Sequence, residues 1–365
     1  MADSDLIFLN AFNTIRGVGP ATLRLIKLNF SALSDAWRAS AAELQRAGIP
    51  PHITESITSS RPSLDPEKLF ADVAKQHAWI VTEDDPCFPP LLKEIPSPPV
   101  MIYGRGTLPP QGTVILAAVG TRRPTSYGIR ATEHIVGRLA DQGIAIASGL
   151  AVGIDTVAHK TALASKGTTI AVLGSGISPS SMFPQENTRL ASRIADEGGA
   201  VISEYLPDAK ARREYFPQRN RIISGLSQGV FVAEARGRSG ALITARFAME
   251  QNRDVFALPG SIFSPTSQGP NRLIQEGAKL VRSADDILEE LGIEYNDNKE
   301  VLTQRLGTLT ETERTLLNLL EHEAGVDALL TKTSLDAAAI LAALSMLELK
   351  GIVKRMGSDT YQRII

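Results

Sequence analysis

The sequence predicts an α/β fold, a Rossmann-like doubly wound and mostly parallel sheet, flanked by an N-terminal helical domain and a C-terminal winged helix. Short β-branched apolar runs alternate with helical segments from residue 114 to 280. Residues 1–60 have helical patterns only, and residues 306–365 are typical of three helices followed by a β-ribbon. The expected domains are residues 1–65, 66–293, and 294–365 with a linker at its start.

Six runs are expected to form the parallel strands. They are almost continuously apolar, which indicates that both of their faces are buried. The stretches 126–142 and 187–197 have helical spacing and are long enough to be crossover helices. The Pro-rich stretch 86–99 is expected to be an extended lead-in rather than a helix. The six runs are 114–121, 144–149, 169–174, 200–205, 229–235 and 254–260.

The N-terminal domain is expected to be separate from the sheet. Residues 15–23 place Gly17 and Gly19 between two short helices, and residues 44–50 form a weaker second unit. The pair resembles a helix-hairpin-helix, or SAM-like, module, whose glycines let backbone N–H groups approach a phosphate. Because few cations besides Arg16 lie nearby, a helical packing module without DNA contact is the alternative.

The C-terminal pattern indicates a winged helix after a polar linker at residues 294–305. Its expected recognition helix begins at Ser334 and has no Lys or Arg before Lys350, which disfavours reading of the DNA major groove. We therefore favour a structural or protein-contact role, although Lys354 and Arg355 on the wing could contact phosphate.

Composition excludes several classes of protein. The net charge of −2 excludes a globally basic nucleic-acid binder but leaves room for a local basic cleft. The single cysteine, Cys87, excludes an internal disulfide and indicates a reducing compartment. No secretion signal or run of about 20 apolar residues is present, so a cytoplasmic location is expected. The five histidines show no metal-ligand spacing, and neither a metal nor a cofactor is expected.

The clearest chemical signal follows the first run, at Gly120, Thr121, Arg122 and Arg123. The glycine frees backbone amides, the hydroxyl can donate, and arginine forks match phosphate oxygens. The alternative is that one arginine pairs with a carboxylate on a neighbouring loop, Arg123 more readily than Arg122. No dinucleotide fingerprint or P-loop motif is present.

A second signal is the segment 211–221, which holds four arginines against one glutamate. Two aromatics, Phe216 among them, are interleaved with these charges, a composition that suits a single strand with its phosphates and unstacked bases. Core packing is the alternative for Phe216. Arg221 is expected to point inward, to Glu204 or Glu234.

Two further strand ends open helices. The segment 238–246 begins at Ser239 and Gly240, whose N–H groups could meet an anion. The other segment, 148–155, ends at Asp155, which suits either a helix cap or a ligand contact. His159 follows Asp155 by one helical turn, and a helix-surface interaction between them is the favoured interpretation.

These segments closely resemble the DprA/Smf family of DNA-processing proteins over residues 88–281. The resemblance implies binding of single-stranded DNA without marked sequence preference, homodimerisation through the Rossmann domain, and help in loading RecA recombinase during natural transformation. The motifs that carry it are, in order, GTRRPTSYG, SGLAVGIDTVAH, VLGSGI, FPQENTRL, SEY, FPQRNRIISGLS, EARGRSGALITARFAMEQNRDVFALPGS and GPNRLIQEGAKLV.

The resemblance also implies site residues. The family's phosphate-binding Gly-Ser/Thr-Arg motif falls on residues 120–122, its second cation on Arg213, and its base-contacting aromatic on Phe216. Ala241 stands where a second serine is common, so one hydroxyl is lost there. The full set expected to bind DNA is Gly120, Thr121, Arg122, Arg123, Arg213, Phe216, Arg219, Ser239 and Gly240.

The alternative function is a Rossmann-type enzyme that binds or cleaves a nucleotide. Against it, the candidate loops contain no convergent acid–base pair, so no catalysis is expected. A purely structural adaptor would leave the arginine cluster unexplained. The expected mechanism is electrostatic capture, in which arginines hold successive phosphates and an aromatic ring stacks on a base.

Overall fold

The computed structural model describes residues 3–293, 309–320, 324–333, 335–350, 352–356 and 359–363. Contacts divide the chain into two compact units, residues 1–294 and 295–365. The expected linker at 294–305 and the expected helix start at Ser334 lie outside the described residues.

The first unit is built on a nine-stranded sheet of order β1-β2-β6-β5-β4-β3-β7-β8-β9. Neighbours from β6 to β9 are parallel, whereas β2 is antiparallel to both β1 and β6. The predicted doubly wound, mostly parallel fold is therefore confirmed. The strands are β1 (Trp79–Thr82), β2 (Met101–Gly106), β3 (Ile115–Val119), β4 (Ala145–Ser148), β5 (Thr169–Val172), β6 (Ala200–Ser203), β7 (Gly229–Val232), β8 (Asp254–Ala257) and β9 (Lys279–Leu280).

The strands β3 to β8 fall within the six predicted runs, and nearly all of their residues are buried. Strands β1 and β2 were not predicted. The Pro-rich lead-in also differs from the expectation, because it contains the short helix α7 (Pro90–Lys93). A proline at the first position of a helix loses no intrahelical hydrogen bond, so this stretch can start a helical turn.

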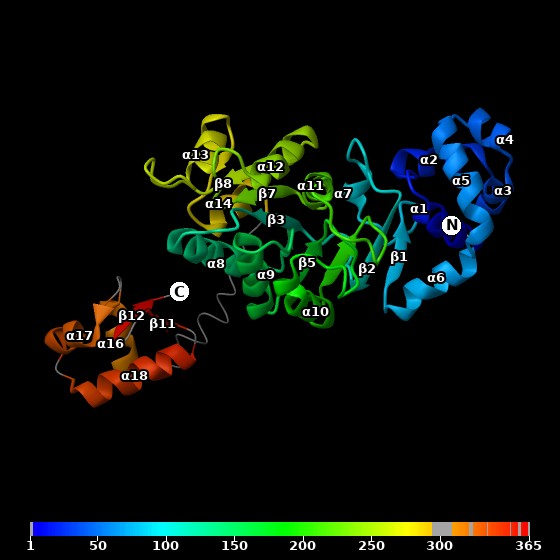
Figure 1. Cartoon of the computed structure of the whole chain (residues 1–365). Helices are drawn as coiled ribbons and strands as arrows, with labels where there is room; N and C mark the ends of the chain where they lie inside the picture. The colour runs from blue at the N-terminus through cyan, green and yellow to red at the C-terminus, as the bar shows by residue number, and fades with distance from the viewer. Residues whose placement is uncertain are drawn as a thin grey trace. The chain divides into compact units, whose positions relative to one another are not determined.

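Two pairs of helices cover the sheet, α8 packed on α9 and α11 packed on α12, and they lie on opposite faces (Figure 1). The chain adds β4, β5 and β6 on one side of β3 and then returns to place β7 on its other side. This reversal creates a crevice at the carboxyl ends of β3 and β7. The helices of this region are α8 (Ser126–Asp141), α9 (Ile154–Ala164), η2 (Gln185–Asn187), α10 (Thr188–Asp196), α11 (Tyr215–Gly225), α12 (Gly240–Glu250), α13 (Gln268–Gln275) and α14 (Ala284–Glu290).

The N-terminal helices form both predicted hairpins. Gly17 and Gly48 take the left-handed backbone, at φ +88° and +83°, that the two turns require. The expectation that these helices are separate from the sheet is wrong, because Phe12 shares a core with Tyr103 of β2. The helices are α1 (Asp3–Thr14), α2 (Pro20–Asn29), α3 (Leu33–Arg38), α4 (Ala41–Arg46), α5 (Pro51–Ser60), η1 (Arg61–Ser63) and α6 (Pro66–Lys75).

The second unit confirms the predicted winged helix. Its strands form a three-stranded sheet of order β10-β12-β11, and its helices share a core with Val353 and Tyr361. No single helix among the described residues is long and apolar enough to span a membrane. Helices α17 and α18 reach the necessary length and apolar composition only when taken together, and the pair is bent by 117°. The elements are α16 (Glu311–Leu319), β10 (Ala324–Gly325), α17 (Val326–Lys332), α18 (Ala337–Leu349), β11 (Val353–Arg355) and β12 (Thr360–Arg363).

Candidate nucleic-acid interface

A cleft of about 320 Å³ opens at the carboxyl ends of β3 and β7, where the strand order reverses. The loops after β3 and β7 and the first turns of α11 and α12 form its walls. Seven of the nine residues predicted to bind DNA line it: Gly120, Thr121, Arg122, Phe216, Arg219, Ser239 and Gly240.

The loop after β3 is held from both sides before any ligand arrives. The Thr121 N–H donates to the Glu234 carbonyl at 2.7 Å, and the Thr121 carbonyl accepts from Ile154 N–H at 3.2 Å. The buried Glu234 carboxylate accepts from the Thr125 hydroxyl at 2.6 Å and the Thr125 N–H at 2.8 Å. Arg122 lies between these anchors with its side chain exposed.

Gly120 is required by close packing. A Cβ at this position would lie 2.6 Å from the Ile154 side chain, so a larger residue would push β3 away from α9. Arg123 is exposed and its N–H donates to the Thr121 hydroxyl oxygen at 3.2 Å, but its side chain does not line the cleft. The role of Arg123 in DNA binding stays a prediction.

Three exposed arginines give the cleft its charge. Arg236 and Arg238, which follow β7, face the same cleft as Arg122. Within the described part of the chain, none of these three arginines pairs with a carboxylate. Arg122 therefore does not form the ion pair with a neighbouring loop that was the alternative for it. Arg236 and Arg238 were not among the predicted site residues, although Arg236-Gly-Arg238 follows a strand at the reversal point. Arg213 is exposed ahead of α11 and is not part of the wall.

Phe216 is half-buried and belongs to the wall of the cleft, not to the core. Its ring meets the edge of Phe183 at a centroid distance of 5.6 Å, and the Arg122 guanidinium lies 6.0 Å from its centroid. Phe183 is 43% exposed. Sequence reasoning missed Phe183; the signal was the repeated Phe-Pro-Gln triplet, at 183–185 and at 216–218.

The expectation that Arg219 offers a cation to DNA is not met, because this side chain is only 6% exposed. Its guanidinium donates to the carbonyl oxygens of Gly149, at 2.7 Å, and Val172. Burial lowers the pKa of Arg219 to about 10, so it remains charged at neutral pH. Arg219 thus positions the floor of the cleft from within.

Asp155 is the carboxylate beside Arg219. It is buried, and its Oδ2 accepts from the N–H groups of Gly149 at 3.2 Å and Ala151 at 3.3 Å. Burial raises the pKa of Asp155, and the nearby Arg219 opposes this shift. Of the two interpretations of Asp155, the structural one fits these contacts, since its oxygen is occupied by the loop that follows β4.

His159 does not form the expected surface interaction with Asp155. It is fully buried, and its Nδ1 lies 2.7 Å from the Thr169 hydroxyl. That hydroxyl donates to the Ile146 carbonyl, so Nδ1 carries the proton, and the buried Nε2 has no hydrogen-bond partner among the described residues. Burial lowers the pKa of His159 to about 3 and keeps the ring neutral.

The start of α12 presents backbone donors to the cleft. The Ser239 side chain caps the helix by accepting from Ala241 N–H at 3.3 Å, and Asn220 Nδ2 donates to the Gly240 carbonyl at 3.1 Å. As the first helical residue, Gly240 has an N–H without an intrahelical acceptor. Arg221 points inward as predicted, with its Nη2 2.6 Å from Glu204.

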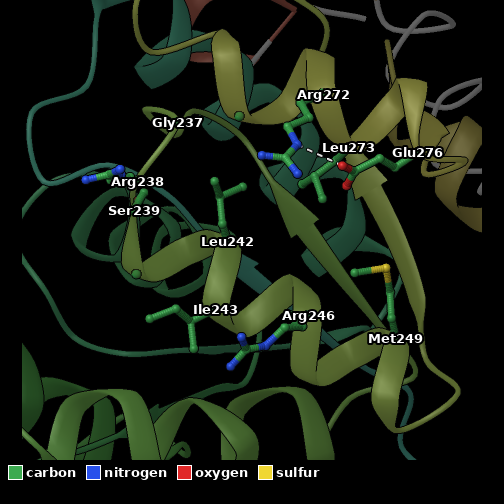
Figure 2. A pocket seen from close by; sticks show the side chains of 12 residues that line it. Gly237, Arg238, Ser239, Leu242, Ile243, Arg246, Met249, Arg272, Leu273 and Glu276 are labelled. Carbon is green, nitrogen blue, oxygen red and sulfur yellow. Dashed lines mark hydrogen bonds and ion pairs between the residues drawn. The ribbon is translucent and has the colours of Figure 1, made fainter.

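A hollow of about 590 Å³ lies on the other side of α12, between α12 and α13 (Figure 2). Arg238, Ser239, Gly240 and Ile243 line both this hollow and the cleft. Its cations do not offer a second free cluster, since Arg272 pairs with Glu276 at 2.7 Å. Between these two hollows beside α12, the larger group of unpaired cations is therefore in the cleft.

The chemistry available in the cleft is that of anion binding. Asp155 is the sole carboxylate in the described lining, and it is buried and hydrogen-bonded. The described residues contain no group of three His, Cys, Asp or Glu side chains able to hold a metal ion. Arginines, helix-start amides and a half-buried aromatic ring suit phosphates joined to bases.

Comparisons with known proteins agree with this chemistry. Residues 79–292 match the family model of DNA recombination-mediator protein A, and residues 300–358 match the DprA winged helix domain. Protein Smf of Synechocystis is 37% identical over 400 residues, covering 100% of both chains. DNA processing protein DprA of Streptococcus pneumoniae is 46% identical over 227 residues, which is 62% of this chain and 78% of that protein.

Solved structures give the same relationship. The structure of DNA processing protein A from Streptococcus pneumoniae matches with a TM-score of 0.67 and 35% identity, covering 80% of this chain and 99% of that one. The structure of DNA processing protein A from Helicobacter pylori, which concerns its single-stranded DNA binding mode, matches with a TM-score of 0.52 and 28% identity. The match covers 59% of this chain and 97% of that one. This chain therefore belongs to the DprA/Smf family of DNA-processing proteins.

Proposed function

We propose that this chain binds single-stranded DNA without marked sequence preference, in the cleft at the carboxyl ends of β3 and β7. The observation that carries the proposal is that Arg122, Arg236 and Arg238 line one cleft together with the half-buried ring of Phe216, whose centroid lies 6.0 Å from the Arg122 guanidinium. Cations take the phosphates, and the aromatic ring takes an unstacked base, which a duplex does not offer. The helix-start N–H of Gly240 adds a donor that carries no base information.

Fluorescence anisotropy of a labelled oligo-dT, with unlabelled competitors, tests this proposal. Single-stranded DNA of any sequence is expected to displace the label at similar concentrations, whereas duplex DNA competes poorly. Mononucleotides would displace it efficiently if the cleft belonged to a nucleotide-binding or nucleotide-cleaving enzyme. Duplex competing as well as single strand would contradict the proposal.

We propose further that the chain does no chemistry on the strand and acts in the cytoplasm as a recombination mediator that helps load RecA onto it. Membership of a family described as recombination mediators supports this role, and the described lining of the cleft has one carboxylate, which is buried. RecA ATPase activity on DNA already coated with single-strand-binding protein measures loading. The wild-type chain is expected to shorten the lag before RecA ATPase activity begins, and Arg122→Ala is expected not to shorten it. A lag that the wild type leaves unchanged would contradict the proposal.

We also propose a homodimer through the Rossmann domain. Leu280 of β9 is 40% exposed, and β9 pairs only with β8 among the described strands. Met249, near the end of α12, is 48% exposed, and α12 packs on β7 and β8. Exposed apolar side chains near a strand edge that lacks a second neighbour favour association with a second copy. Sedimentation is expected to give a dimer for the wild type and a monomer for Leu280→Lys, since a charge on an edge strand opposes pairing. Equal masses would contradict this placement.

A further inference from the structure

A second cleft, of about 890 Å³, lies between the first N-terminal hairpin and the sheet region. One wall is the segment 13–23, and the other is the loop after β6 together with α11. Both walls belong to the same compact unit. The N-terminal helices are fixed to the sheet by the hydrogen bond from Asn13 to the hydroxyl of Tyr103 in β2, at 3.0 Å, and by the ion pair of Lys27 in α2 with Glu83 after β1, at 2.8 Å. The cleft is thus a fixed feature of this unit.

The charge of this cleft is positive. Arg16, Lys210 and Arg212 line it and are exposed, and none of them pairs with a carboxylate within the described residues. The one carboxylate in its described lining, Glu204, is neutralised by Arg221. Three uncompensated cations around one hollow indicate an anionic ligand with several charges.

The cleft also offers aromatic surface. Tyr205 and Tyr215 stack with ring centroids 3.7 Å apart and planes 15° apart, and both line the cleft. The Arg212 guanidinium lies 5.6 Å from the centroid of the Tyr215 ring. Aromatic rings beside cations suit unstacked nucleic-acid bases. An acidic peptide would use the cations but not the rings.

Helix α11 is the wall that the two clefts share. Tyr215, Gln218 and Arg221, spaced by three residues, line the second cleft. Phe216 and Asn220, spaced by four, line the cleft at β3 and β7. Residues three and four apart lie on one side of a helix, so each face of α11 serves one cleft. A strand leaving Phe216 has only to cross this one helix to reach Tyr215.

We propose that the second cleft binds the continuation of the same single strand, with phosphates on Arg16, Lys210 and Arg212 and a base against the tyrosine stack. This inference rests on the proposed single-strand binding at the first cleft. The hairpin itself contributes only Arg16 to this site, and the loop that faces it contributes Lys210 and Arg212. The hairpin can therefore take part in DNA binding although it has few cations of its own.

The test compares salt dependence for a short oligo-dT of about 6 nucleotides, which fills one cleft, with a long one of about 20. The variant is Arg16→Ala/Lys210→Ala/Arg212→Ala, and the matched control is Lys68→Ala/Lys160→Ala/Lys166→Ala, three exposed lysines that line neither cleft. On the long strand, the slope of log K against log salt should fall by about 0.7 for each lost cation, or about 2 in all. On the short strand, variant and control should have the same slope.

Equal slopes for variant and control on the long strand would overturn the inference, as would an equal loss on both lengths. Arg122→Ala separates this failure from that of the proposed function. If Arg122→Ala weakens binding of the short strand while the triple variant behaves as its control, only the second cleft is wrong. If Arg122→Ala leaves short-strand binding unchanged, the proposed function itself fails.

Discussion

Single residues in and beneath the cleft divide into those that face the solvent and those that hold the others in place. Gly149 illustrates the second kind, because a Cβ there would lie 2.8 Å from both Arg219 Nη2 and Asp155 Oδ2. The buried arginine and carboxylate therefore close around a position with no side chain. Arg122 and Phe216, in contrast, are exposed or half-buried and free to meet a ligand.

Phe216→Ala is expected to weaken binding of single-stranded DNA by about 1–3 kcal/mol, because one base loses its stacking partner. The slope of log K against log salt should not change, since no cation is removed. Anisotropy titrations at several salt concentrations measure both quantities. Phe263→Ala, which truncates a ring that is 89% exposed and away from the cleft, is the control. A changed salt slope together with an unchanged affinity would argue against a base contact at Phe216.

Arg219→Ala is expected to reduce the free energy of unfolding by about 3–5 kcal/mol, because Asp155 would remain buried without its cation. Urea denaturation measures the loss, and Arg122→Ala, which removes an exposed arginine, should leave stability nearly unchanged. A stable Arg219→Ala protein whose salt slope falls as that of Arg122→Ala does would restore Arg219 as a phosphate contact.

His159 predicts a specific loss of stability in acid. Its pKa is about 3 in the folded chain against an ordinary value of 6.5, so the unfolded chain binds the extra proton as the pH falls below about 6.5. Between pH 7 and pH 5 this linkage removes about 2 kcal/mol from the free energy of unfolding. Urea denaturation at both pH values should show that loss in the wild type and lack it in His159→Gln. Parallel losses would mean that His159 titrates normally.

Among the elements, the loops at the carboxyl ends of β3, β4 and β7 create the site, because the strand order reverses there. These strands were predictable since each is a short apolar run with both faces buried. Strands β1 and β2 were harder, because β1 is only half-buried and both flank a Pro-rich stretch. Their antiparallel pairing depends on contacts far apart in sequence, such as Trp79 with Gly104.

The candidate site was predictable to the extent that it lies at strand ends. Arg122, Phe216 and Gly240 come together because their loops share one edge of the sheet. The sequence alone could not show that Arg219 is buried while some of its neighbours are exposed. The direction in which a side chain of α11 points depends on how the helix packs on the sheet, and here the Arg219 guanidinium meets the carbonyl groups of Gly149 and Val172. Phe183 was missed for a related reason, since its partner Phe216 is 33 residues away (216 − 183).

For the whole molecule, the N-terminal helices and the sheet act as one unit, and the winged helix has a core of its own. Helix α18 has no Lys or Arg in its 13 residues. Deletion of residues 295–365 is therefore expected to leave both the affinity for oligo-dT and its salt slope unchanged. Anisotropy with the truncated and full chains measures this, after circular dichroism shows that the truncated chain is folded. A slope reduced by about 0.7 or more would place phosphate contacts on the winged helix.

The most direct test of the central claim is the salt dependence of oligo-dT binding by the wild type, by Arg122→Ala and by Arg272→Ala. Arg272 is paired with Glu276 outside the cleft, so its loss serves as the control. A phosphate contact at Arg122 predicts a slope shallower by about 0.7 for Arg122→Ala alone, together with weaker binding. The same slope and affinity for all three proteins would contradict a strand held in the cleft at the carboxyl ends of β3 and β7.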